Sequence, residues 1–282
     1  PLIIADMKGG LVVQVLDAGA WKVVPVGPNI SADAVSVLAK DHQLGAVWGG
    51  SDNDVRILHG DFVFVTDGDT ITAATAVSGS CALEDHCTFA PTGDLAGDAA
   101  LYDHDAGKYT LRQLACTVDG CQWTSVPGVD FGDSDMGGSS SPFRRVFFHD
   151  KDGKGTLVRP MSNPGDEGNY SVLASTTDAK LTVRPSGAFQ IGAAPRPGGG
   201  LAVAVRTYDD KLVLHVTGAD GKVQDVDLGT SSTAEEPIQV HVREAGGVEK
   251  VHVVVREEQT TVGHFVVSLP GGNVTHESID LR

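Results

Sequence analysis

Hydrophobic and polar residues alternate along this chain in short runs, and turns rich in Gly, Asp and Asn separate the runs. This alternation has the two-residue period of a β-strand with one buried face, and the turn residues are typical of hairpins. Only residues 30–42 could form a helical turn or two, and "AVSVLA" within them alternates well enough to be a strand. The pattern predicts an all-β protein with less than about a tenth of its residues in helix.

A longer period is superimposed on this alternation. Six segments share one form, in which an apolar strand, a polar acidic turn and an alternating strand are usually followed by a third strand. The first strands of the six segments contain Ile3, Val47, Leu101, Phe147, Val203 and Val253. A period of roughly 50 residues with about four strands per unit is the sequence mark of propeller blades.

The fourth strand of a blade can be recognised in three of the units, as "AVSVLA" (34–39), "AFQIGAA" (188–194) and "PIQVHV" (237–242). We therefore expect residues 1–282 to form a single β-propeller of six blades with antiparallel strands. The blades are expected to start near residues 1, 34, 88, 142, 188 and 237. The alternative all-β fold is a pair of β-sandwich domains divided in the Gly/Ser-rich stretch 132–142, where no innermost strand for the fourth blade is recognisable.

Two segments about a hundred residues apart place a Trp, a Val and a Pro at matching positions. They are "GAWKVVPVG" (19–27) and "GCQWTSVPG" (120–128). The second lies in "TVDGCQWTS" (117–125), which is similar to an Asp box, a hairpin motif in which Asp and Gly precede Trp. On these features the chain resembles β-propeller repeat proteins, most nearly the sialidase-like and Asp-box group.

A sialidase within that group implies three Arg that grip a carboxylate, a Tyr/Glu nucleophilic pair and an acidic general acid. Arg159 in "LVRP" and Arg184 in "TVRP" lack the residue between Arg and Pro in the family's Arg-x-Pro signature, and none of the four Tyr lies beside an obvious Glu at a strand end. The resemblance therefore favours the propeller fold more than sialidase activity.

The charge of the chain narrows the choice of partners. Its net charge of −16 argues against nucleic acid, because affinity for phosphates requires Lys and Arg. Anionic membrane surfaces are disfavoured for the same reason, and no apolar run approaches the ~20 residues of a transmembrane helix. The chain begins at Pro1 without a signal-peptide pattern, so we expect a processed mature protein or a domain of a larger one.

Four cysteines form two close pairs, Cys81/Cys87 and Cys116/Cys121. Four cysteines allow three connectivities, and the sequence cannot choose among them, but local pairing is the economical prediction. A zinc site is the competing interpretation; the spacings are wider than C-x₂-C and no matching His pair accompanies them. Disulfides imply an oxidising compartment, so we expect a secreted or cell-surface location.

Acidic residues concentrate in the turns between the second and third strands of the expected blades. In two of these turns they lie beside histidines, which makes the following residues candidate ligand-binding residues: Asp103, His104, Asp105, His149, Asp150 and Asp152. Further acids, including Asp209, Asp210, Glu257 and Glu258, occupy the corresponding turns of the last two blades. Such a rim suits a cation-bearing partner, although Asp is also simply a good turn residue.

One acidic turn, "HDKDGKGT" (149–156), begins like a calcium loop, with Asp150 and Asp152 at alternate positions. It is no EF-hand, because Lys154 and Met161 stand where further oxygen ligands are required. The two Asp could bind Ca²⁺, but the pattern favours a metal-free Asp-Gly hairpin turn.

These observations favour a secreted or surface-exposed propeller that acts as a binding module for a protein or glycan partner. The alternative, from a different functional class, is a carbohydrate-active enzyme, a glycosidase or lyase, with two carboxylates at the mouth of the propeller channel.

Overall fold

The structure is a computed structural model of the whole chain. It describes residues 2–7, 10–17, 20–25, 34–40, 43–49, 54–59, 62–63, 70–71, 75–80, 87–93, 96–103, 108–117, 120–133, 146–149, 155–162, 170–176, 180–185, 188–207, 209–230, 238–258 and 260–280. Every element in these ranges is a β-strand or a turn, and none is a helix. It follows that these ranges contain no helix able to cross a membrane.

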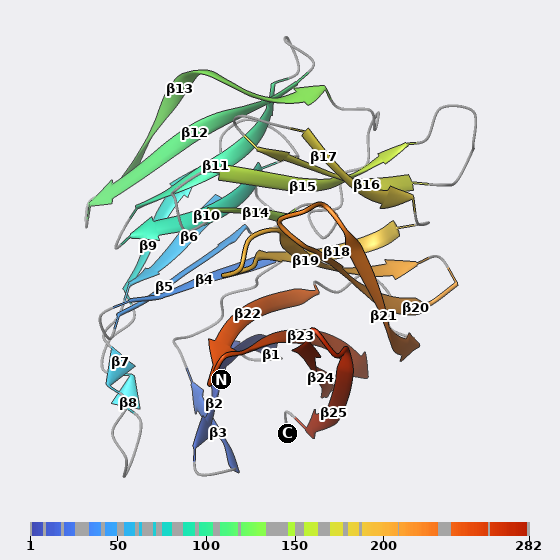
Figure 1. Cartoon of the computed structure of the whole chain (residues 1–282). Helices are drawn as coiled ribbons and strands as arrows, with labels where there is room; N and C mark the ends of the chain where they lie inside the picture. The colour runs from blue at the N-terminus through green and yellow to red at the C-terminus, as the bar shows by residue number, and fades with distance from the viewer. Residues whose placement is uncertain are drawn as a thin grey trace. The chain divides into compact units, whose positions relative to one another are not determined.

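Most strands belong to sheets built from segments that follow one another in the chain, and each described register is antiparallel (Figure 1). The sheets fall into two compact units. The first consists of residues 1–103 and 110–129, and the second consists of residues 104–109 and 130–282.

The first unit holds a three-stranded sheet (β1–β3), a four-stranded sheet (β4, β5, β6 and β9), a small hairpin (β7–β8) and most of the β10–β13 sheet. The strands are β1 Leu2–Met7, β2 Gly10–Asp17, β3 Ala20–Pro25, β4 Ala34–Lys40, β5 Gln43–Gly49, β6 Asp54–His59, β7 Phe62–Val63, β8 Thr70–Ile71, β9 Thr75–Ser80, β10 Cys87–Gly93, β11 Ala96–Asp103, β12 Lys108–Thr117 and β13 Gly120–Asp133.

The second unit holds three four-stranded sheets, and within each sheet the strands lie side by side in the order in which they follow one another in the chain. The strands are β14 Val146–His149, β15 Gly155–Ser162, β16 Tyr170–Thr176, β17 Lys180–Pro185, β18 Ala188–Pro195, β19 Leu201–Thr207, β20 Lys211–Thr217, β21 Val223–Thr230, β22 Gln239–Ala245, β23 Val248–Glu258, β24 Thr261–Leu269 and β25 Asn273–Asp280.

Burial falls from the second strand of a sheet to its last strand. The run "LAVAVR" of β19 is buried on both faces, whereas β21 alternates around buried Val226 and Leu228, and in β25 only Ile279 is buried. A continuous apolar run is the pattern of a strand covered on both sides, and an alternating one that of a strand with one wet face. These sequences therefore place β19 inside the unit and β21 and β25 at its outside.

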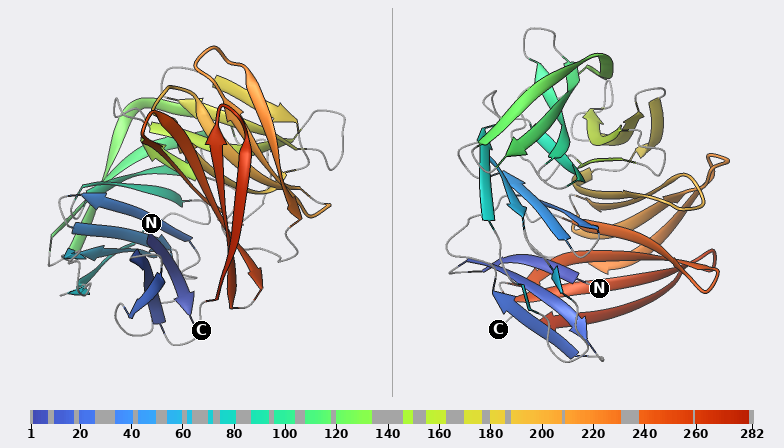
Figure 2. Two further views of the ribbon diagram at one scale, coloured as in Figure 1. Left: turned by 60° about the horizontal axis from the view of Figure 1, so that its bottom comes forward. Right: turned by 90° about the vertical axis from the view of Figure 1, so that its left-hand side faces the viewer.

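The β18–β21 and β22–β25 sheets pack face to face through an apolar core (Figure 2). One side of the core is made of Ala194, Ala202, Ala204, Leu212, Leu214, Val216, Val226 and Leu228, and the other of Ile238, Val242, Val251, Val253, Val255, Phe265, Val267 and Leu269. The small residues Ala194, Ala202 and Ala204 meet branched residues of the other sheet in this core, which allows the two sheets to approach closely. We call the space between these two sheets the seam.

The other face of the β18–β21 sheet packs on the β14–β17 sheet. Val158 of β15 joins Ile191, Val203 and Val205 in a second core, with Val146 and Phe148 packed against it. The opposite side of β14 carries Phe147, whose ring meets that of Phe131 edge-on at 5.6 Å. The second unit is thus a succession of sheets, each covered by the next.

Candidate ligand-binding site at the seam

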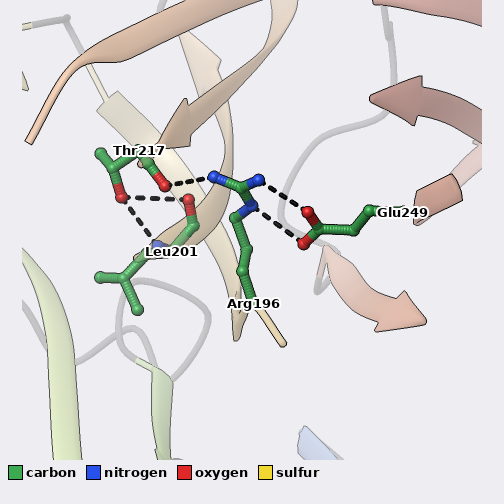
Figure 3. Close-up of polar contacts among 4 residues, drawn as sticks. All are labelled: Arg196, Leu201, Thr217 and Glu249. Carbon is green, nitrogen blue, oxygen red and sulfur yellow. Dashed lines mark hydrogen bonds and ion pairs between the residues drawn. The ribbon is translucent and has the colours of Figure 1, made fainter. Parts of the chain in front are cut away.

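An ion pair joins the two sheets at one end of the seam (Figure 3). Arg196, in the turn between β18 and β19, donates from Nε and Nη2 to the two carboxylate oxygens of Glu249 at 2.9 and 2.6 Å. Its Nη1 donates to the carbonyl of Thr217 at 2.6 Å. The side chains are only 15% and 14% exposed, so this bidentate pair is shielded from solvent.

This contact fixes which ends of the two sheets lie together. Glu249 is at the start of β23, and Arg196 directly precedes β19. A second contact on the same side involves Gly272, where an added Cβ would lie 2.9 Å from Nε2 of Gln224. Since the turns 196–200 and 246–247 are at one end, the ends of β19 and β23 share the opposite end of the seam. That opposite end carries the candidate site.

On the β18–β21 side, the site is built around Arg206, which is 5% exposed. It lies on the same face of β19 as Ala202 and Ala204, so its side chain points into the seam. Its Nη2 donates to Oδ1 of Asp210 at 2.6 Å, and its Nη1 reaches Oε1 of Gln190 at 3.5 Å. Gln190 is opposite Arg206 in the β18–β19 register and is 3% exposed.

Two hydrogen-bond donors in this group have no partner in the part of the chain that the structure describes. Nε of Arg206 and Nε2 of Gln190 are both buried and unsatisfied within the described residues. Leaving a buried donor unpaired costs roughly 1–3 kcal/mol, more when it is charged, and most buried polar groups in native proteins are paired. Such donors are candidates for a hydrogen bond to a ligand.

Polar groups of the β22–β25 sheet face the same end of the seam. Glu257 follows Val251, Val253 and Val255 on the core face of β23 and lies over Gly263. Its two oxygens accept hydrogen bonds from His276 Nε2 and Ser278 Oγ, both at 2.7 Å. The ring of His276 stacks on that of Phe265, with centroids 4.3 Å apart and planes 13° from parallel. This sheet thus presents a carboxylate, a hydroxyl and a flat aromatic surface.

The Arg206 group thus offers donors and a carboxylate, and the Glu257 group of the facing sheet offers a carboxylate and the His276 ring. A small polar ligand with several hydroxyls could take hydrogen bonds from Arg206 and Gln190 and donate to the Asp210 carboxylate. Among the described residues, no group of three or more His, Cys, Asp or Glu is arranged to hold a metal ion.

The acidic turn between β19 and β20 is partly neutralised. Asp210 pairs with Arg206, and Asp209 pairs with Lys211 at 2.6 Å. A hydrogen bond from Lys211, followed by one from Thr207, lowers the pKa of the Asp209 carboxyl below its usual value. In this turn, therefore, each acidic residue predicted as part of a negative rim already has a cationic neighbour.

Of the candidate residues predicted from the sequence, two have their backbone described. His149 ends β14, is half-buried, and meets the ring of Phe147 edge-on at 5.3 Å. Asp103 ends β11, and its side chain lies outside what the structure describes. The others, His104, Asp105, Asp150 and Asp152, lie outside the described residues, and so does the possible Ca²⁺ site. These assignments stay predictions.

The predicted disulfides also stay predictions. Cys81 lies outside the described residues, and the side chains of the other three are not described. Along the backbone, Cys116 and Cys121 each stand one residue inside the facing ends of the neighbouring strands β12 and β13.

Sequence reasoning missed the group around Arg206. Its only sequence signal is a cation at the end of an otherwise apolar strand, "LAVAVR", followed by the acidic turn. An Arg at a strand end is read by default as solvent-exposed. Only the register that places Gln190 opposite it, and the small residues beside it, show that it points into the seam.

No protein-family model matches this chain, and no curated protein matches it either. Among solved structures, it is similar over 99% of its length to AofleA from Arthrobotrys oligospora, with a TM-score of 0.61, 10% identity and 90% of that chain covered. The SapL1 lectin in complex with α-methyl fucoside matches 100% of this chain and 96% of its own, with a TM-score of 0.57 and 13% identity. Aleuria aurantia lectin in complex with α-methyl-L-fucoside matches 99% and 94%, with a TM-score of 0.57 and 10% identity.

At these identities the similarity establishes the fold. The chain is an all-β protein with the β-propeller fold, as the repeat pattern predicts. One fold accounts for essentially the whole chain, so the alternative of two sandwich domains does not describe it. The number of blades, six in our prediction, and the blade boundaries stay predictions.

Proposed function

We propose that this protein is a glycan-binding β-propeller, secreted or displayed at the cell surface, that binds saccharide hydroxyls at the Arg206 end of the seam. The observation that carries the proposal is a pair of buried donors, Arg206 Nε and Gln190 Nε2, that have no partner among the described residues. Saccharide hydroxyls accept and donate hydrogen bonds, so they complement this group and the carboxylates beside it.

The site also has the aromatic surface that sugar recognition uses. Small-molecule sites combine an apolar wall with a few oriented polar groups, and the His276 ring, stacked on Phe265 and bonded to Glu257, offers such a wall on the facing sheet. The planar guanidinium of Arg206 can donate to two neighbouring hydroxyls at once, which a Lys ammonium in its place could not reproduce.

The comparisons support a saccharide as the ligand. SapL1 and Aleuria aurantia lectin were crystallised with α-methyl fucosides, and both share the fold of this chain over nearly its full length. The AofleA structures include a variant in which three Arg are replaced by Ala. The two close cysteine pairs favour the oxidising compartment in which a secreted lectin would fold.

A glycan array followed by titration calorimetry tests the proposal. The wild-type protein should bind one or more glycans, with α-methyl-L-fucoside as the first monosaccharide to try. Arg206→Lys keeps the charge beside Asp210 but removes the planar fork, and should weaken binding by at least about tenfold. Lys211→Gln, an exposed change in the same turn, is the control and should change affinity by less than about twofold.

Thermal unfolding of each variant shows whether the fold is retained. A folded Arg206→Lys variant with wild-type affinity would disprove the assignment of the site, and the absence of any bound glycan on the array would disprove the function.

A further inference from the structure

A row of basic side chains lies on the face of the β22–β25 sheet that points away from the seam. Arg243 is directly opposite Lys250 in the β22–β23 register, and His241 is directly opposite His252. Residues two apart on a strand share a face, so all four side chains project from the same side of the hairpin. We call these four residues the basic ladder.

The two strong cations of the ladder have no acidic partner among the described residues. Seven Lys and Arg lie between residues 188 and 280, and five of them bond a carboxylate or a carbonyl: Arg196, Arg206, Lys211, Lys222 and Arg256. Within the described part of the chain, Arg243 and Lys250 make no ion pair and no side-chain hydrogen bond. Like charges directly opposite each other on a sheet are destabilising. In a chain of net charge −16, two neighbouring cations without an acidic partner among the described residues are unusual. An anionic ligand between them would relieve their repulsion.

The histidines of the ladder add a buried lone pair. Nδ1 of His264 is 2.7 Å from the Glu277 carboxylate, which can only accept, so this nitrogen carries the proton. In the neutral ring, Nε2 of His264 then accepts from Nδ1 of His252, 3.0 Å away. His252 is left with an unprotonated Nε2, which is buried and unpartnered within the described residues.

The position of this lone pair places it within the ladder. The two nitrogens of an imidazole point away from each other, so Nε2 of His252 faces away from His264 and β24, toward the β22 side. His241 lies on that side, with its ring centroid 6.4 Å from that of His252. Both His241 and Arg243 are exposed, which leaves the hairpin end of the ladder open to solvent. The ladder thus offers two cations and an acceptor that lacks a donor.

We infer that the basic ladder binds an anionic saccharide, whose carboxylate or sulfate group lies between Arg243 and Lys250 and whose hydroxyl donates to Nε2 of His252. One ligand then satisfies both needs of the ladder, because the acidic group pairs the cations and the neighbouring hydroxyl fills the buried lone pair. A metal cation is a poorer occupant, since the charge of Arg243 opposes it. The inference rests on the proposed function in taking the ligand to be a saccharide, but it concerns a different face of the sheet from Arg206.

Nuclear magnetic resonance titration with matched ligands tests the inference, because it can follow weak binding. The probes are methyl α-D-glucuronide, its uncharged counterpart methyl α-D-glucoside, a sulfated methyl glucoside, and inorganic sulfate alone. The readouts are the dissociation constant and the Cε1–H signals of His241 and His252. Lys250→Gln and Arg243→Gln are the test variants, and Lys222→Gln is the matched control at a fully exposed site on another turn.

The glucuronide or the sulfated glucoside should bind at least about fivefold more tightly than the methyl glucoside and should shift the His252 signal. Each test variant should weaken that binding by at least about fivefold, whereas Lys222→Gln should leave it within about twofold. Equal weakening in Lys250→Gln and Lys222→Gln would overturn the inference, because the effect would then be one of net charge alone.

The remaining outcomes separate this inference from the proposed function. Glycan binding that depends on Arg206 but not on Arg243 or Lys250 would overturn the inference and leave the proposed function standing. Binding of sulfate without binding of any glycoside would overturn the saccharide ligand here, and together with a blank glycan array it would overturn the proposed function as well.

Discussion

Gly192 of β18 lies directly against the backbone of Ile238, at the start of the β22–β25 sheet. A methyl group on Gly192 would meet the Ile238 carbonyl oxygen and would lie 2.8 Å from its carbon. This is a contact between two backbones, so no side-chain rotation can relieve it. At this point the two sheets that carry the candidate site leave no room for a side chain between their backbones.

Gly192→Ala should therefore loosen the seam. Forcing an extra methyl group into a packed interior costs about 1–3 kcal/mol, and here the backbone itself must move. Chemical denaturation should show a loss of this size in the free energy of unfolding. Gly198→Ala is the matched control, because an added Cβ there has its nearest neighbour at 4.0 Å, and its stability should equal or slightly exceed that of the wild type. Equal stability of the two variants would contradict the packing described for the seam.

The Arg196–Glu249 pair should couple the two sheets energetically. Removing either partner alone leaves the other charge half-buried and should cost about 1–3 kcal/mol. A double-mutant cycle with Arg196→Gln and Glu249→Gln should give a coupling energy above about 1 kcal/mol. The Lys222–Asp220 pair, at 88% and 56% exposure, should give less than about 0.5 kcal/mol in the same experiment. A coupling energy of similar size for both pairs would show that the Arg196–Glu249 pair does not hold the two sheets together.

Acid should destabilise the protein through His252. Burial, and then the positive charge of Arg243, lower the pKa of His252 to about 4. Because the folded state binds this proton less readily than the unfolded chain, with its ordinary value near 6.5, the contribution of His252 to stability is complete above pH 6.5. It is lost as the pH falls from 6.5 to about 4, and the loss is on the order of 3 kcal/mol.

Denaturation at a series of pH values, together with the Cε1–H titration of His252, measures this effect. A midpoint for His252 near 6.5 in the folded protein would contradict its burial as a neutral ring.

The fold was accessible from the sequence because hydrophobic alternation and turn residues are local signals. The segments "AVSVLA", "AFQIGAA" and "PIQVHV" form β4, β18 and β22, each the edge strand that begins its four-stranded sheet. The β14–β17 sheet differs from the predicted blade. Its first strand is "VFFH", which the repeat pattern predicts as the second, and its last strand is "KLTVRP", which the repeat pattern does not include. β14 has only four residues, so its short apolar run could not be distinguished from a longer inner strand.

The candidate site was not accessible in the same way. Gln190 and Arg206 are sixteen residues apart and meet only through the β18–β19 register, and the Glu257 side of the seam comes from another sheet. The acidic turns stood out in the sequence because Asp is abundant there. At the candidate site, the described residues with unfilled hydrogen bonds are an Arg and a Gln near the ends of apolar strands, and sequence pattern alone does not show whether such side chains point inward.

The central claim is that Arg206 Nε–H donates to a bound glycan, and its ¹H–¹⁵N signal tests this directly. The signal is assigned by its absence from the Arg206→Lys spectrum and is then followed during titration with the best glycan from the array. The account predicts that it shifts with the same dissociation constant that calorimetry gives, while the Nε–H signal of Arg196, at the other end of the seam, stays in place. An Arg206 signal that does not move while the glycan binds would contradict the account.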